Sequence, residues 1–546
     1  MTAGDLGQAT LAATFALLAQ VRERLGQRTG GGRDIDAHQV AVRRYANLAA
    51  RLQAAQALAD WADDGAVANP DARAMAGLSA ADFALEAVHV IERHGADFGL
   101  TADALAAAFP VGMRAALAQL LDDARFRALG ERAVSHGFAN HGAIHGEDAD
   151  LTLALRDAAR RFAAERVAPI AQRIHTDDLL VPEELIAGMA ELGFFGMSIP
   201  AEYGGTGMSN LAMVVATEEL SVASLPAAGS LITRPEVLAK ALLAGGTEAQ
   251  KQRWLGPVAR GELMVGVAVT EPDTGSDVAA LRCRATPAVQ AGVAGWLIDG
   301  AKAWSTFAGR ADVLALLART DPDPAAGHRG LSLFIVEKER CLGHEFDLHQ
   351  PGGGRLTGKA DRTPGYRGMH SFTLQFERWF VPGDRLVGEA GRGFYYQMAG
   401  FAAGRLQTAG RATGLAQASL LAAGQYVQQR RQFGRAIGEF QSTAYELGWM
   451  ALRTEAARQL SHAAARAMDA GQADAGLLAA MAKLFACRVA VEVSQRAQLL
   501  HGGWGYAEEF PIARFVADAL VLPIFEGVEP ILELKVIGRQ LLGGGA

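Results

Sequence analysis

The sequence predicts a mainly helical protein with a β domain in the middle of the chain. Two observations support this fold class. Apolar residues recur at helical spacing on both sides of residues 264–390, and within that span short β-rich runs are broken by Gly, Pro and Asp. A chain of 546 residues is also too long for one hydrophobic core, so several domains are expected.

Residues 1–135 are rich in alanine and leucine and contain almost no segment with strand character. Residues 13–26 and 41–64 are typical amphipathic helices, with charged residues at helical spacing. We therefore expect an all-helical N-terminal extension.

Residues 136–148 contain several glycines and histidines and are typical of a linker. Metal ligation is one interpretation of His136, His141 and His145. Because glycines separate these histidines, they share no fixed face. A solvated linker is the default interpretation, and no metal site is predicted.

Residues 149–263 return to helical spacing, and we expect a second helical domain there. Leu155, Ala159 and Phe162 lie on one stripe and the neighbouring arginines on another. The following β domain, residues 264–390, contains five runs of strand character, which are 264–271, 295–306, 312–320, 331–338 and 372–382. Residues 391–546 are again helical in spacing and form the C-terminal domain.

Composition excludes several classes of protein. A net charge of −7 argues against nucleic acid as a partner, because binding to phosphates requires a basic surface. Lys483 and Arg488 interrupt the longest apolar helical stretch, so no membrane span is expected. The N-terminus does not resemble a signal peptide. The three scattered cysteines show no metal-ligand spacing and fit a reducing cytoplasm.

Two motifs in the β domain could carry chemistry. Residues 269–281, "VTEPDTGSDVAAL", form a turn rich in backbone donors, which suits anionic or carbonyl oxygens. In residues 299–309, "DGAKAWSTFAG", Trp304 and Thr306 alternate with Ser305, so on a regular strand they face the same way. An indole beside a hydroxyl suits a flat cofactor. A simple turn and a buried core tryptophan are the structural alternatives.

Three further motifs lie in the C-terminal helical region. "QQRRQFGRAIGEFQS", residues 428–442, offers arginines and a glycine to a diphosphate, although a charged helix end gives the same pattern. "LLHGGWGYAEEFP", residues 499–511, ends a long helix at paired glycines. "PIFEGVEPIL", residues 523–532, places Glu526 among apolar residues, where burial would favour a base that works near neutrality.

These five motifs, in this order, resemble the acyl-CoA dehydrogenase family over about residues 149–546. The resemblance implies a helical domain, a middle β-barrel and a C-terminal four-helix bundle, to which residues 1–135 are an addition. It also implies non-covalently bound FAD and desaturation of an acyl-CoA thioester between Cα and Cβ.

The resemblance assigns roles to individual residues. Thr270 would hydrogen-bond the flavin ring, Trp304 would pack on it and Thr306 would reach its N5 region. Arg430 would bind the FAD diphosphate of a neighbouring subunit, with Phe433 beside it. The backbone of Gly502 and Gly503 would approach the adenosine portion, Ser276 would line the substrate's path, and Glu526 would be the catalytic base.

Other members of the family place the base on a bundle helix, just before a recurring arginine. Here that position is Gly404, followed by Arg405, so Glu526 is the candidate that remains. Three positions depart from the family pattern: Leu499 replaces a glutamine, Ala517 replaces the arginine of an Arg-Asp pair and Val528 replaces a threonine. Each departure is expected to remove or reroute a polar contact to the cofactor.

The N-terminal extension resembles a branch of the family whose substrate carries a second, distal carboxylate. Such a group requires a cationic or hydroxyl partner, and Arg405 is the candidate. We also expect a homodimer or homotetramer and an electron-transferring flavoprotein as acceptor. The alternatives are a generic short-chain or branched-chain acyl-CoA dehydrogenase, a flavin oxidase of the same fold, and a non-catalytic relative that binds CoA esters or proteins.

Overall fold

A computed structural model describes residues 3–64, 71–135, 144 and 148–543 of the chain. The chain divides into two compact units. Unit 1 comprises residues 1–155 and 408–546, and unit 2 comprises residues 156–407. His136, His141 and His145 lie outside the described residues, as does most of the predicted linker.

The N-terminal part of unit 1 is helical, as predicted. Its helices are α1 (Ala3–Arg28), α2 (Gln39–Asp63), α3 (Ala72–Phe98), α4 (Ala102–Ala108), α5 (Val111–Leu120), α6 (Asp123–Ser135) and α7 (Ala149–Phe162, up to Leu155 in this unit). Gly99 ends α3 in the left-handed conformation, with φ at 73°. Thr101 begins α4 by accepting a hydrogen bond from the backbone N–H of Ala104. α1, α2 and α3 pack against one another through buried leucine, valine and alanine side chains.

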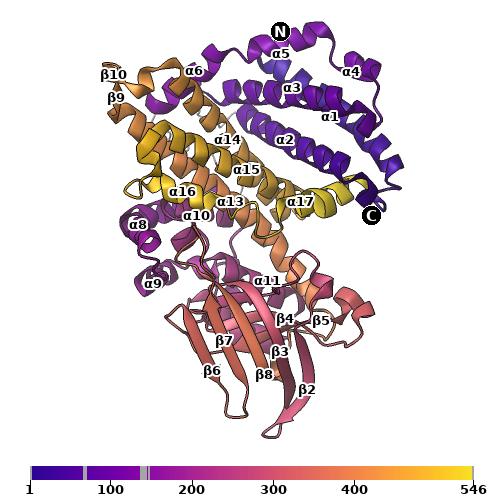
Figure 1. Ribbon diagram of the computed structural model, residues 1–546, viewed down its shortest axis with the longest axis vertical. Coiled ribbons are helices and arrows are strands. Elements are labelled where there is room, and N and C mark those ends of the chain that lie inside the picture. Colours follow the sequence, from indigo (N-terminus) through magenta and orange to yellow (C-terminus); the bar gives the residue numbers. More distant parts are fainter. Residues whose placement is uncertain (1–2, 65–70, 136–143, 145–147, 544–546) are drawn as a thin grey trace. The chain divides into compact units, whose positions relative to one another are not determined.

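The C-terminal part of unit 1 is built on long helices. They are α13 (Gly393–Gln429, from Thr408 onward in this unit), α14 (Gln441–Asp469) and α15 (Ala475–His501), followed by α16 (Pro511–Ala519), α17 (Glu529–Ile531), the π-helix η11 (Leu532–Gly538) and α18 (Arg539–Leu542). α2 contacts α14, α15 and η11, and Figure 1 shows α2, α14 and α15 side by side. The extension and the C-terminal helices therefore share one core.

Unit 2 begins with helices and continues into a sheet. The helices are α8 (Ala168–Thr176), α9 (Glu183–Glu191), α10 (Asn210–Ala223), α11 (Thr233–Gly245) and α12 (Glu248–Ala259). α12 begins with a capping box, in which the Thr247 side chain accepts from the backbone of Gln250 and the Gln250 side chain accepts in return.

The sheet contains β1 (Val265–Ala268), β2 (Arg284–Gln290), β3 (Val293–Thr306), β4 (Val313–Arg319), β5 (Leu331–Glu337), β6 (Glu345–His349), β7 (Arg355–Ala360) and β8 (Ser371–Pro382). Its order is β1-β4-β2-β3-β8-β7-β6, with β5 also paired to β4 (Figure 1). β4 pairs in parallel with β1 and β2, and the remaining pairs are antiparallel. The predicted fold class is confirmed: a mainly helical chain with a curled sheet in its middle and an added N-terminal helical region.

One helix of the described chain, α3, is long and apolar enough to cross a membrane, and the bent pair Ala102–Ala108 and Val111–Val134 passes the same test together. The most apolar window of α3 has a mean hydropathy of 1.4, and 61% of it is buried inside the protein. This burial is typical of a core helix.

Candidate active site

The motif at residues 269–277 lies against the end of β3 in unit 2. The carbonyl of Thr270 accepts a hydrogen bond from the backbone N–H of Ala303, at 2.8 Å. Lys302, which is fully buried, donates to the Glu271 carboxylate at 3.0 Å and to the carbonyl of Val269 at 2.9 Å. The two predicted flavin motifs are therefore joined by a buried ion pair, and neither Glu271 nor Lys302 was among the predicted site residues.

Trp304 does not lie on a regular strand. The pairing of β3 with β8 shifts between Lys302 and Ser305, and Trp304 adopts the left-handed conformation with φ at 55°. The indole is 59% exposed, whereas Thr306 is buried and its Oγ1 lies 3.0 Å from Oγ of Ser371. This bulge breaks the strict alternation on which the expectation of a shared face was based. It also leaves a large flat side chain open to a ligand.

The predicted substrate residues of unit 2 lie in different environments. Ser276 is exposed in the loop after β1. Arg405 is half-buried on α13, next to the buried Gly404. Gly404 has no side chain to act as a base, as the sequence indicated.

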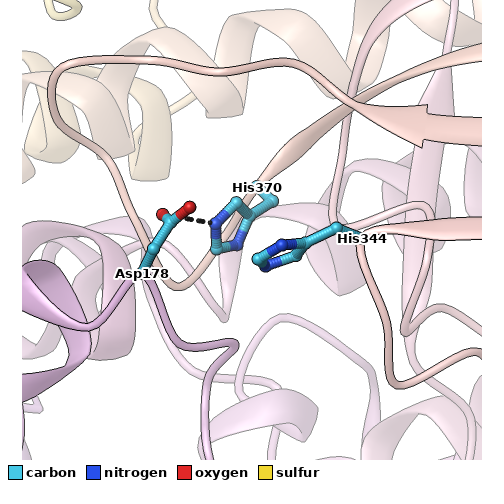
Figure 2. A group of neighbouring side chains, drawn as sticks. All are labelled: Asp178, His344 and His370. Atoms are coloured by element: carbon cyan, nitrogen blue, oxygen red, sulfur yellow. Dashed lines mark hydrogen bonds and ion pairs between the residues drawn. The ribbon is translucent and has the colours of Figure 1, made fainter.

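Asp178, His344 and His370 form a second polar cluster in unit 2 (Figure 2). Their possible ligand atoms all lie within 4.8 Å of one another. Nε2 of His370 lies 3.0 Å from Oδ1 of Asp178, and the rings of His344 and His370 are 4.6 Å apart. Nε of Arg367 also lies 3.4 Å from that carboxylate oxygen. Because a cation already neutralises Asp178, we interpret the cluster as an ion-pair network and assign no metal to it.

The pKa values in this cluster have identifiable causes. Burial lowers the pKa of His370 below its ordinary value, although Asp178 opposes the shift. Burial would raise the pKa of Asp178, but the hydrogen bond from His370 and the charges of His370 and Arg367 lower it overall. Asp178 is therefore the stable anion of the cluster.

In unit 1, the predicted diphosphate motif forms a tight hairpin after α13. β9 (Arg431–Gln432) pairs with β10 (Arg435–Ala436), and Phe433 and Gly434 form the turn with φ at 51° and 83°. Phe433 is 93% exposed, and Arg430 is exposed at the start of the hairpin. The predicted diphosphate motif is therefore a solvent-exposed turn of unit 1.

The paired glycines at the end of α15 lie against the same part of α13. His501 stacks on Tyr426, with ring centroids 4.3 Å apart. Gly502 has φ at 59°, and a Cβ added to Gly502 or Gly503 would meet no atom within 4 Å. The backbone here is open to a close ligand. The structure thus brings the predicted diphosphate and adenosine motifs together within unit 1.

Glu526 lies in a turn that is fixed on both sides. The backbone N–H of Glu529 donates to the carbonyl of Pro523 at 2.9 Å, and Nζ of the buried Lys483 donates to the carbonyl of Gly527 at 2.7 Å. Glu526 adopts the left-handed conformation with φ at 53°, which is rare for a residue with a side chain.

The surroundings of Glu526 within unit 1 leave its carboxylate uncommitted. The residue is half-buried and takes part in no hydrogen bond or ion pair with the other described residues of this unit. Beneath the turn, the guanidinium of the fully buried Arg411 lies 4.7 Å from the centre of the Phe525 ring. Backbone hydrogen bonds therefore fix the turn, and the Glu526 carboxylate takes no part in them.

The three departures from the family pattern differ in their structural effect. Leu499 is 80% exposed, and Val528 begins α17 through its backbone. Ala517 cannot pair with Asp518 as the family's arginine does, but Arg514 lies one helical turn earlier. Its Nη1 is 3.8 Å from Oδ2 of the fully buried Asp518. Asp518 therefore retains a cationic neighbour.

Comparison with known proteins identifies the family. The family model "Acyl-CoA dehydrogenase, N-terminal domain" matches residues 150–262, the middle-domain model matches 266–379, and the C-terminal model matches 391–542. The chain belongs to the acyl-CoA dehydrogenase family. It is therefore an oxidoreductase that acts on a CH–CH bond of an acyl-CoA substrate, and its family implies a flavin cofactor.

Several relatives of this acyl-CoA dehydrogenase are informative. The (2S)-methylsuccinyl-CoA dehydrogenase of Cereibacter sphaeroides is 43% identical over 77% of this chain and 74% of its own. The butyryl-CoA dehydrogenase structure from Megasphaera elsdenii has a TM-score of 0.66 and 31% identity, and covers 73% of this chain and 100% of its own. A chain solved in a structure of the electron transferring flavoprotein of Acidaminococcus fermentans has a TM-score of 0.66 and 32% identity, and the match covers 73% of this chain and 98% of that chain.

Sequence reasoning missed the residues that support the site. Glu271 and Lys302 lie inside the predicted motifs, and the available signal was their opposite charges, one just after the apolar strand β1 and the other on β3. Lys483 was treated only as an interruption of an apolar stretch, although a lone lysine on an apolar helix requires a partner when buried.

Proposed function

We propose that this acyl-CoA dehydrogenase oxidises (2S)-methylsuccinyl-CoA to mesaconyl-CoA with FAD, as a step of the ethylmalonyl-CoA pathway, with Glu526 as the base. One support for the substrate is the similarity to the relative of that name. Another is that three segments of the sequence, 17–26, 365–376 and 402–417, resemble a (2S)-methylsuccinyl-CoA dehydrogenase. Support also comes from the helical extension that precedes the family domains in this chain.

The observation that carries the proposal is the state of Glu526. Non-glycine residues at positive φ mark positions where the surrounding structure holds a strained backbone, and they cluster at functional sites. Trp304, Phe433 and Glu526 are three of the eight described non-glycine residues in this conformation. Among the residues that the structure describes, only Glu526 combines the strain with an uncommitted carboxylate, and Gly404 leaves no base at the alternative family position.

Within each unit, several described residues offer groups that suit a part of an FAD. Trp304 offers an exposed flat surface for the isoalloxazine, and Thr270 and Thr306 are its proposed polar partners. In unit 1, Arg430 would offer bidentate donors to the FAD diphosphate of a neighbouring subunit, beside Phe433, and the bare backbone at Gly502 and Gly503 suits an adenosine. When bound, FAD supplies the acceptor for the hydride that leaves Cβ.

Glu526 supplies the other half of the reaction. The α-C–H of a thioester is a weak acid, so a carboxylate removes its proton only where the developing enolate is stabilised and water is excluded. The carboxylate of Glu526 accepts that proton. The electron pair of the broken C–H bond then forms the double bond between Cα and Cβ. Lys483 keeps the turn in one conformation during this step through the Gly527 carbonyl.

Two further residues line the proposed substrate site. Ser276 lies on the path of the acyl-CoA, in the exposed turn after β1. Arg405 pairs with the distal carboxylate of methylsuccinyl-CoA, because a guanidinium binds a carboxylate in bidentate fashion. A monocarboxylic substrate has no second carboxylate for this guanidinium to bind.

The proposal includes the partners of the enzyme. A homodimer or homotetramer would cover the exposed Phe433 and bring Arg430 to the diphosphate of a neighbouring subunit. An electron-transferring flavoprotein would reoxidise the enzyme in the cytoplasm. The similarity to the chain solved with the electron transferring flavoprotein of Acidaminococcus fermentans supports this acceptor.

The main alternative is a generic short-chain or branched-chain acyl-CoA dehydrogenase, which the similarity to butyryl-CoA dehydrogenase favours. An acyl-CoA oxidase of the same fold differs only in its electron acceptor. A non-catalytic relative would have no reason to keep Glu526, Trp304 and Arg430 together.

Bleaching of the bound flavin by a panel of acyl-CoA esters tests the substrate. We expect (2S)-methylsuccinyl-CoA to bleach the flavin and butyryl-CoA to do so far more slowly. Equal bleaching by both esters would contradict the proposed specificity. Reoxidation of the bleached enzyme in air, compared with reoxidation by an electron-transferring flavoprotein, separates the dehydrogenase from the oxidase.

A further inference from the structure

The segment that follows Glu526 packs directly on the N-terminal extension. η11 contributes Leu532 and Ile537 to a buried cluster with Ala46, Ala49 and Ala50 of α2 and with Ala480, Met481 and Leu484 of α15. The alanines allow a close approach: a Cβ added to Gly538 of η11 would lie 2.3 Å from Cγ1 of Val42. The extension is therefore in contact with the backbone that leads away from the proposed base.

Glu533 connects the two segments through charge. Its side chain is only 3% exposed, and Oε2 accepts from Nε of Arg43 at 2.7 Å. Its Oε1 accepts from Nδ2 of Asn47 at 3.3 Å and from Nη2 of Arg488 at 2.7 Å. A buried carboxylate with three donors is held far more rigidly than a surface ion pair.

Arg488 links Glu533 to the turn that carries Glu526. The same Nη2 donates to Oε1 of Glu529 at 2.5 Å. Glu529 closes the turn on one side through its backbone bond to Pro523, and Lys483 fixes Gly527 on the other. A continuous path of hydrogen bonds thus runs from Arg43 of the extension through Glu533, Arg488 and Glu529 to the turn that carries Glu526.

We propose that Arg43 and Glu533 are positioning residues, through which the N-terminal extension holds Glu526 at the angle that proton abstraction requires. This inference rests on the proposed role of Glu526 as the base. Its physical reason is geometric: a left-handed conformation persists only when neighbouring contacts fix it, and a displacement of about 1 Å costs on the order of 10²-fold in rate.

A purely structural role for the network gives a different signature. Loss of structure lowers the fraction of active enzyme but leaves the chemistry of each active molecule unchanged. A misplaced base slows proton abstraction itself. The primary isotope effect with substrate deuterated at the α carbon therefore rises only in the second case.

The experiment uses the full-length holoenzyme and (2S)-methylsuccinyl-CoA, unlabelled and deuterated at the α carbon. R43Q and E533Q remove the two ends of the Arg43–Glu533 contact. R44Q is the matched control, because Arg44 is the next residue on α2 and pairs instead with Asp97 of the extension itself, at 3.1 Å. Arg43 is 41% exposed, so R43Q keeps the test valid if E533Q fails to fold.

We expect R43Q and E533Q to retain flavin and KM, to lose about 10-fold in kcat and to show a larger isotope effect. R44Q should match the wild type, and R43K should recover most of the lost kcat. If R43Q and E533Q show the isotope effect of R44Q, the positioning role is overturned. E526Q separates this failure from a failure of the proposed function, because only the latter predicts that E526Q retains turnover.

Discussion

Gly130 of α6 and Gly448 of α14 pack so closely that neither has room for a side chain. A Cβ on Gly130 would lie 1.9 Å from the carbonyl oxygen of Ala444, and one on Gly448 would lie 1.9 Å from that of Phe126. The obstacles are backbone atoms, which cannot rotate away. The extension is therefore joined to the C-terminal helices backbone to backbone, in addition to the Arg43–Glu533 contact.

Substitution of Gly130 by alanine should destabilise unit 1. G130A forces the two helices apart, and overpacking of this kind costs about 1–3 kcal/mol. Thermal unfolding of the holoenzyme measures the effect. G112A is the control, because a Cβ on Gly112 of α5 meets nothing within 4 Å and alanine favours the helix. A melting temperature for G130A at or above that of G112A would contradict the close packing.

Substitution of Glu271 by glutamine should impair both stability and flavin binding. E271Q leaves the fully buried charge of Lys302 without its anion, and breaking a buried pair costs about 3–5 kcal/mol. The melting temperature and the flavin content of the purified protein measure the two effects. E345Q is the matched control, because Glu345 forms an exposed pair with Lys359 in the same sheet and should change neither quantity.

Stability should fall as the solution is acidified below the ordinary histidine pKa. Because burial lowers the pKa of His370 in the folded protein, the unfolded chain binds a proton below about pH 6.5 that the folded protein does not bind. Between that pH and the folded pKa, the free energy of unfolding therefore becomes smaller as the pH falls. The lowered pKa of Asp178 acts only below about 3.9, outside this window.

The change H370N should flatten this dependence. Melting temperatures of the wild type and the variant, measured from about pH 7.5 to 5.5, reveal the difference in slope. H349N serves as the control, since His349 is exposed near the end of β6. Identical slopes for the wild type and H370N would show that another group causes the acid sensitivity.

The periodicity of the sequence was sufficient for the helices and for the apolar strands, but not for the whole sheet. β2, β6 and β7 were not predicted. β2 contains Pro287, and β6 and β7 alternate charged residues with few apolar ones. These strands are held by their neighbours, since β2 pairs along its length with β3 and β7 with β8. Their stability comes from pairing, which a local pattern does not contain.

The site residues that lie in short sequence motifs could be predicted. Trp304 illustrates the limit: its residue type was visible, but the bulge that exposes it depends on the register between β3 and β8. The supporting residues were harder to predict because their partners are distant in sequence. Glu533 and Arg43 are separated by 490 positions, and Lys483 and Gly527 by 44. Single residues of this kind give no signal until the fold brings them together.

Rapid mixing of flavin-loaded E526Q with (2S)-methylsuccinyl-CoA tests the role of Glu526 most directly. Glutamine keeps the shape of the side chain but accepts no proton, and a general base contributes about 10²- to 10⁴-fold. We expect E526Q to bind FAD and the thioester normally and to bleach more slowly than the wild type by a factor in this range. Bleaching at the wild-type rate would show that another group removes the α-proton.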